Sequence, residues 1–166
     1  MEGFAQVPGP LLVSLFCARD CAPVVGDSRV QVHGADSVSN PLPIQALLKH
    51  DAQADVMAIP LLPVGRVAGL TSLIDAMALG VPVLWTRNPG LDIDIEAIGC
   101  GLWVNVGDAA AWARAIARLP RDRAALDAMG ERGMQFAAQH LDMATCSAPV
   151  ERIVRGVLGT TEAPRS

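Results

Sequence analysis

The residues best suited to chemistry lie close together in the middle of the chain, at Gly69, Thr71, Ser72 and Asp75. A glycine-containing loop that runs into a helix leaves several N–H groups unpaired at the positive end of the helix dipole, where a phosphate group binds readily. Gly69, Thr71 and Ser72 would form such a site. The same spacing also fits a capping box, in which Ser72 is the N-cap and Asp75 returns a hydrogen bond. The spacing alone does not decide between the two interpretations.

The elements that must position these residues are short apolar runs, which alternate with longer segments of helical period. This alternation is typical of βαβ units, so the sequence predicts an α/β fold with a Rossmann-like parallel sheet flanked by helices. The predicted strands are residues 11–17, 29–33, 55–59, 81–85 and 102–105. Ligands of such a sheet bind beyond the carboxyl ends of its strands, which directs attention to the loops after Ile59 and Trp85.

Apolar stripes at helical spacing predict the helices. One helix opens at Pro43, and another lies between the third and fourth strands and closes at Gly80. Asp108 is a suitable N-cap for a helix that follows the last strand. The helix after that contains Gly130 and Gly133, each of which weakens it by about 1 kcal/mol relative to alanine unless a neighbour packs closely there.

The last predicted helix is capped by Ser147, has Pro149 in its first turn and carries an apolar stripe. The stripe consists of Val150, Ile153, Val154, Val157 and Leu158. It is too apolar to face water, so we expect the helix to return across the domain. Without such cover the stripe would favour self-association into a homo-oligomer.

Composition limits the class of protein. A chain of 166 residues with 51% hydrophobic residues suits one core, so we expect a single domain over residues 1–158 and a disordered tail at 159–166. The net charge is −4 and the basic residues are scattered, which argues against nucleic acid as a partner. No run approaches the roughly 20 apolar residues of a membrane span, and no signal peptide is evident, so we expect a cytoplasmic location. The four cysteines lack zinc-site spacing, which favours buried free thiols and no metal.

One motif and the segments around it point to a known family. The motif is Asp75-Ala-Met-Ala-Leu-Gly80-Val-Pro-Val, in its place after a strand and a loop. Together with residues 30–34, 86–96 and 99–108, it resembles the C-terminal domain of glycosyltransferase family 4. Members of that family are retaining enzymes of the GT-B fold that use nucleotide-activated sugars. The resemblance therefore implies glycosyl transfer, in the synthesis of a polysaccharide, lipopolysaccharide or glycolipid.

The resemblance also implies how a nucleotide-sugar donor is held. The N-terminus of the motif helix would bind the donor diphosphate through Gly69, Thr71 and Ser72. The cation that neutralises the diphosphate would be Arg66, in the same loop, or Arg87, after the next strand. Either arginine could instead be an ordinary solvated loop residue.

The resemblance assigns the ribose to the carboxylate of Asp75 and places His33 and Gly34 at the nucleotide pocket. A strand-end histidine whose ring is bound by backbone groups is the alternative for His33. No residue is assigned as catalytic, and no cofactor is implied.

The chain departs from the family pattern in two respects. Val67 stands where the family has the first of two glutamates, and the second of them is Asp75 here. The basic pair and the strand that open the family's domain are missing, because the only lysine is Lys49, inside a helix. The acceptor would bind to an N-terminal domain that is missing or belongs to a separate chain. The alternatives are a non-catalytic nucleotide-binding or interaction module and a nucleotide-sugar epimerase domain.

Two further groups of residues have structural interpretations. Asp92, Asp94 and Glu96 could bind a hard cation, or begin a short helix and point to solvent. The tryptophans occupy core positions and are interpreted as packing residues; they are Trp85, Trp103 and Trp112.

Overall fold

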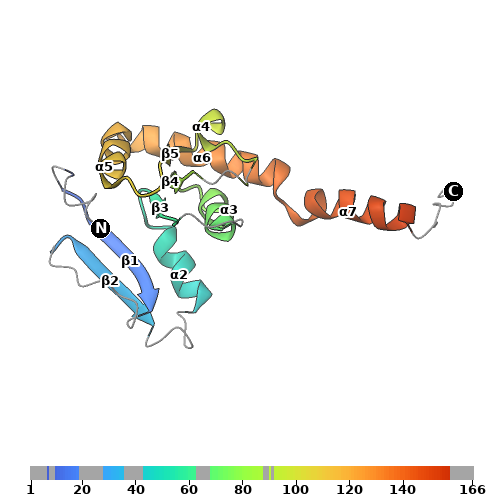
Figure 1. Ribbon diagram of the computed structural model, residues 1–166, viewed down its shortest axis with the longest axis horizontal. Helices are drawn as coiled ribbons and strands as arrows, with labels where there is room; N and C mark the ends of the chain where they lie inside the picture. Colours follow the sequence, from blue (N-terminus) through green and yellow to red (C-terminus); the bar gives the residue numbers. More distant parts are fainter. Residues whose placement is uncertain are drawn as a thin grey trace.

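Strands and helices alternate through most of the chain (Figure 1). The computed structural model describes residues 7, 10–18, 28–35, 43–62, 68–87, 90 and 92–157, so the predicted tail lies outside the described residues. In chain order the elements are β1 (Val13–Ala18), β2 (Val30–Ala35), α2 (Ile44–Asp51), β3 (Met57–Ile59), α3 (Leu70–Ala78), β4 (Val83–Thr86), α4 (Ile95–Ile98), β5 (Gly101–Val104), α5 (Ala109–Arg118), α6 (Arg123–His140) and α7 (Met143–Val157). The predicted α/β class, with parallel strands and flanking helices, is confirmed.

The strands pair in parallel, and their hydrogen bonds divide them between two sheets. β1 pairs with β2 in a register that sets Phe16 opposite His33. β4 lies in the middle of the other sheet, between β3 and β5, and sets Trp85 opposite both Ile59 and Trp103. The two-stranded sheet lies apart from the three-stranded one in Figure 1, with α2 beside both. The sequence predicts the strands but not this division.

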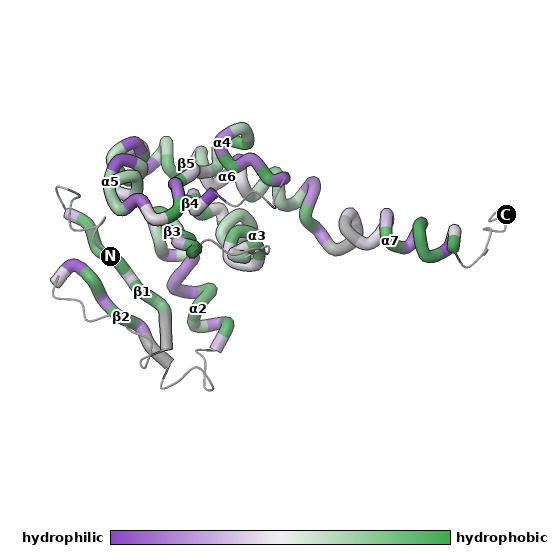
Figure 2. The backbone as a smooth tube through the Cα atoms, viewed as in Figure 1, coloured by the Kyte–Doolittle hydropathy of each residue, from purple (hydrophilic) through white to green (hydrophobic). Residues whose placement is uncertain are grey.

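The three-stranded sheet is covered by helices on both faces. On one face, Val83 and Trp85 of β4 pack with α3 and α6 in a cluster that includes Leu73, Met77 and Ala137. On the other face, Leu84 packs with Val104 of β5 and Ala115 of α5. All four residues of β4 are buried, and helices flank the three-stranded sheet on both sides in Figure 2, as is usual for a central parallel strand.

The glycines of α6 mark a close approach between helices. A Cβ added at Gly130 would lie 1.7 Å from the carbonyl oxygen of Gly80, just after α3. A Cβ added at Gly133 would lie 3.1 Å from the Cβ of Cys100. Both glycines are buried, so close packing accounts for two residues that would otherwise weaken the helix.

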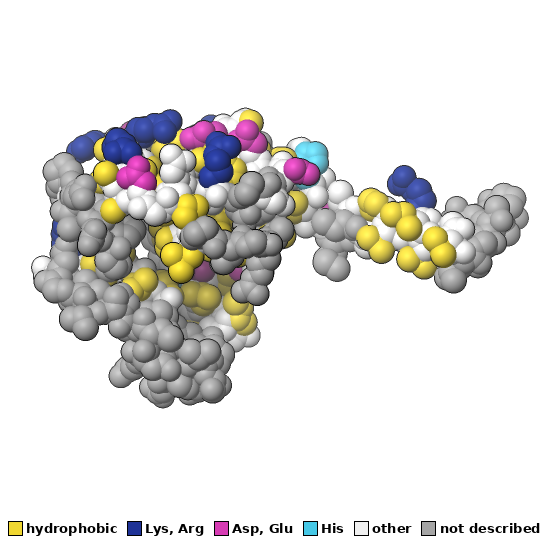
Figure 3. Space-filling model, viewed as in Figure 1, with side chains coloured by type: hydrophobic (Ala, Val, Ile, Leu, Met, Phe, Trp, Pro, Cys, Tyr) yellow, Lys and Arg dark blue, Asp and Glu magenta, His cyan; other side chains and the backbone are white. Residues whose placement is uncertain are grey.

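The last helix differs from its prediction in start and direction. It begins at Met143 rather than after Ser147, because Asp142 accepts a hydrogen bond from the backbone N–H of Thr145, and Pro149 lies inside it. It does not return across the domain: α6 ends at His140, and α7 continues outward from that end (Figure 1). Its apolar side chains form an exposed patch in Figure 3, with Val150, Ile153, Val154 and Val157 all exposed. Within the described residues, no helix is long and apolar enough to cross a membrane.

Candidate functional site

The N-terminus of α3 lies just beyond the carboxyl end of β3. Gly69 occupies the N-cap position in the left-handed conformation, with φ of 75°, and has no side chain to cap the helix. The first intrahelical bond is donated by the N–H of Leu73 to the carbonyl of Gly69, so the preceding amides have no acceptor within the helix. Thr71 and Ser72 in this turn are exposed. The capping-box interpretation is wrong, because Ser72 lies inside the helix and the cap is Gly69.

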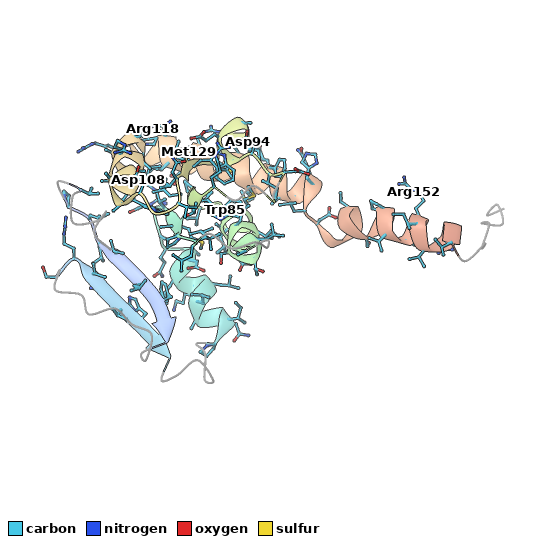
Figure 4. All side chains as sticks on the ribbon, viewed as in Figure 1. Trp85, Asp94, Asp108, Arg118, Met129 and Arg152 are labelled. Carbon is cyan, nitrogen blue, oxygen red and sulfur yellow. The ribbon has the colours of Figure 1, made fainter. Side chains whose placement is uncertain are left out.

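Gly69 is required where it stands. Its φ is one that side chains rarely adopt, and a Cβ would meet Ile59 at 2.9 Å, the indole nitrogen of Trp85 at 3.1 Å and Leu61 at 3.2 Å. The α3 N-terminus is thus pressed directly onto the end of the sheet. Trp85, labelled in Figure 4, is fully buried, and its Nε1 has no hydrogen-bond partner among the described residues.

Asp75 lies in the second turn of α3, close enough to another acidic residue for its charge to act on that residue's pKa. Asp51, the last residue of α2, is half-buried, and its pKa is raised by desolvation and by the nearby negative charge of Asp75. His50 acts in the opposite direction on the pKa of Asp51. The structure therefore brings the end of α2 beside the residue predicted to bind ribose. Asp51 was not predicted to lie at the site, because nothing in the residues around it signals a neighbour on another helix.

His33 belongs to an aromatic cluster that joins β1, β2 and α2. Its ring stacks on Phe16 with 5.0 Å between centroids and lies 5.0 Å from the ring of His50. Its Nε2 is buried and has no hydrogen-bond partner among the described residues. The alternative interpretation, in which backbone groups bind the ring, therefore fails at this atom. Gly34 follows it on β2. His50 was not predicted to take part.

Of the two arginines predicted to neutralise the diphosphate, the structure describes only one. Arg66 lies outside the described residues. Arg87 is exposed, and its guanidinium carbon lies 5.1 Å from the centroid of Trp103, which in turn stacks on Trp85. A cation–π contact of this kind holds Arg87 at the β5 side of the sheet.

The acidic residues after β4 have structural roles. Asp94 caps α4 by accepting hydrogen bonds from the N–H groups of Glu96 and Ala97, and it also accepts one from the indole of Trp103. These bonds, that of Trp103 foremost, lower the pKa of Asp94. Asp94 is labelled beside α4 in Figure 4. The prediction that these residues begin a short helix is confirmed for Asp94, the N-cap of α4, and for Glu96 in its first turn.

Cysteine and metal chemistry find little support in the described part of the chain. Cys100 is a buried free thiol whose pKa is raised to about 11 by desolvation, so it stays protonated at neutral pH. The side chains of Cys17, Cys21 and Cys146 are not described. No group of three or more His, Cys, Asp or Glu side chains among the described residues could hold a metal ion.

Comparison with known proteins decides the family. Residues 21–122 match the family model described as glycosyl transferases group 1. The chain belongs to this family. Within the family, the chain is 34% identical over 108 residues to the D-inositol 3-phosphate glycosyltransferase of Corynebacterium jeikeium, and 34% identical over 124 residues to that of Corynebacterium urealyticum. These alignments cover 65% and 75% of this chain but only 25% and 27% of those enzymes, so this group 1 chain spans about a quarter of their length.

Solved structures agree on the fold of this family member. Sucrose-phosphate synthase from Thermosynechococcus elongatus superposes with a TM-score of 0.72 at 23% identity, covering 96% of this chain and 41% of that one. Anabaena HepE, solved in complex with UDP, gives a TM-score of 0.63 at 19% identity, covering 93% and 43%. The predicted relation to the GT-B glycosyltransferases is thus confirmed at the level of family and fold.

Proposed function

We propose that this chain is the donor-binding domain of a group 1 glycosyl transferase and that it binds the nucleoside diphosphate of a nucleotide sugar at the N-terminus of α3. In this proposal Gly69 lets the diphosphate approach the amides of Thr71 and Ser72, and Asp75 accepts hydrogen bonds from the ribose hydroxyls. Arg66 supplies a positive charge to the diphosphate. His33 and Gly34 border the nucleotide pocket from β2.

The observation that carries the proposal is the uncapped first turn of α3. Its amides point out of a helix whose other side is fixed in the core by Leu73 and Met77, and the exposed residues of that turn leave room for a ligand. A helix N-terminus favours an anion by about 0.3–1 kcal/mol, and charge-assisted hydrogen bonds from the amides add to this. The turn lies at the carboxyl edge of a parallel sheet, where ligands of such folds bind.

The comparisons support the same role. HepE, which shares the fold, was solved with UDP, and the curated relatives are D-inositol 3-phosphate glycosyltransferases. We infer a retaining transfer reaction in polysaccharide, lipopolysaccharide or glycolipid synthesis. The acceptor then binds to a separate N-terminal domain, because catalysis in this fold takes place between two domains.

A titration of the 166-residue chain with UDP and with GDP, followed by backbone amide chemical shifts, tests the proposal. We expect the largest shifts at residues 68–75, a dissociation constant on the order of 1 mM, equivalent to about −4 kcal/mol, and little preference for the base. Asp75→Asn should weaken binding and leave the fold intact. Asp127→Asn on the exposed side of α6 is the matched control and should bind as the wild type does. Shifts that map away from α3, or equal binding by Asp75→Asn, would refute the proposal.

A further inference from the structure

Thr86 is a buried polar side chain at the end of β4. Only 2% of it is exposed, and it is the one residue of the described chain that is both polar and buried. The strand hydrogen bonds continue past it, since the N–H of Arg87 donates to the carbonyl of Val104. Its hydroxyl is therefore not needed for strand pairing. It accepts a hydrogen bond of 3.0 Å from the backbone N–H of Leu61, which lies 25 residues earlier in the chain.

Leu61 links this hydroxyl to the N-terminus of α3. Its backbone is held by Thr86, and its side chain lies against Gly69, where an added Cβ would be 3.2 Å from its Cδ1. Gly69 also lies against Trp85, the strand neighbour of Thr86. Consecutive residues of β4 thus hold both ends of the loop between β3 and α3. The contacts run from Thr86 through Leu61 to Gly69, and from there to the first turn of α3.

We propose that Thr86 is a positioning residue for the diphosphate of the donor. This inference rests on the proposed function, and it adds a residue that does not touch the ligand. The hydroxyl of Thr86 holds the backbone of Leu61 in position, and the side chain of Leu61 packs against Gly69. The conformation of Gly69 in turn sets the direction of the amides of Thr71 and Ser72. Hydrogen bonds weaken steeply as the donor turns away from the acceptor, so a small rotation of these amides weakens their hydrogen bonds to an anion.

Thr86→Val tests the hydroxyl with almost no change of shape. It leaves the N–H of Leu61 without its acceptor, and we expect the affinity for UDP to fall about tenfold, as the loss of well-aligned hydrogen bonds would give. Thr86→Ser keeps the hydroxyl and should restore the affinity. Thr145→Val, the same substitution on exposed α7, is the matched control. The affinities are measured by amide-shift titration well below each variant's unfolding temperature, so that a loss of stability alone does not move them.

A second readout needs no ligand. In the free chain, Thr86→Val should change the amide shifts of residues 68–72, and Thr145→Val should not. If these shifts and the UDP affinity of Thr86→Val both match the wild type, the positioning role is wrong. If the free-chain shifts respond as expected but the wild type does not bind UDP, the proposed function fails, while the control of the α3 N-terminus by Thr86 stands.

Discussion

Gly130 is the position where a single methyl group should do most harm. In Gly130→Ala the new Cβ would lie 1.7 Å from the carbonyl oxygen of Gly80, 2.5 Å from its carbonyl carbon and 3.3 Å from the amide nitrogen of Val81. All three are backbone atoms, so no flexible side chain can move aside. Either α6 or the end of α3 must shift by more than 1 Å to restore ordinary contact.

The size of the effect follows from two opposing terms. Overpacking a core costs about 1–3 kcal/mol, and a clash with backbone belongs at the upper end of that range. Replacing a mid-helix glycine by alanine returns about 1 kcal/mol. We therefore expect Gly130→Ala to lower the free energy of unfolding by about 2 kcal/mol, which for a chain of this size lowers Tm by about 4–8 °C.

Thermal and urea unfolding followed by circular dichroism measure this change. Gly156→Ala is the matched control, because Gly156 lies inside α7 and a Cβ there meets nothing within 4 Å. It should raise helicity at 222 nm and cause no loss of stability. Gly133→Ala should have an intermediate effect, since its Cβ meets the Cβ of Cys100 at 3.1 Å. If Gly130→Ala unfolds at or above the wild-type temperature, the close approach of α6 to Gly80 is not present in solution.

Three further predictions concern pH, turnover and association. Because hydrogen bonds lower the pKa of Asp94 below its ordinary 3.8, its contribution to stability is complete above about pH 5 and is lost as the pH falls through the lowered pKa. Asp94→Asn should therefore be less stable than wild type at pH 7 and flatter in acid unfolding curves, whereas the exposed neighbour Asp92→Asn should follow the wild type. The isolated chain should form no glycoside from a nucleotide sugar and any acceptor, because holding the two together supplies about 7–11 kcal/mol of such a barrier; product detected by mass spectrometry would contradict this. The exposed stripe of α7 should cause self-association at high concentration in sedimentation experiments, and Val154→Glu should remove it; a wild-type monomer would be evidence against this.

Most helix boundaries could be predicted from the chemistry of residues near them in the sequence. Asp108 caps α5 as expected: its short carboxylate accepts a hydrogen bond of 2.8 Å from the N–H of Ala111, an amide that has no partner within the helix. Gly80 ends the turn after α3 in the left-handed conformation, with φ of 69°. The expectation that Gly130 needs a close neighbour is also confirmed. Each of these features depends on residues near in sequence, or on a penalty that only one kind of contact relieves.

Features set by distant contacts could not be predicted in this way. Ser72 has every local property of an N-cap, yet α3 begins earlier, after Gly69, which is pressed against Trp85 and Leu61 in a left-handed conformation that glycine adopts readily. The neighbours Asp51 and Asp75, on different helices, are likewise brought together by the fold. The bond from the backbone N–H of Leu61 to the hydroxyl of Thr86 joins the loop after β3 to the end of β4, and the two residues share no motif.

The two glycine contacts of α3 connect its stability with its proposed role. At the N-terminus Gly69 lies on Trp85, and after the C-terminus Gly80 lies on Gly130, so the helix is fixed at both ends by contacts that admit no side chain. Leu73 and Met77 fix the middle in the core. Nine residues at 1.5 Å each make α3 about 13.5 Å long, so its two ends are joined by a short, regular helix and a forced shift at one end strains the packing of the other. We therefore expect a displacement at Gly130 to reach the amides of Thr71, so that the tight packing of α6 helps to hold the proposed anion site in place.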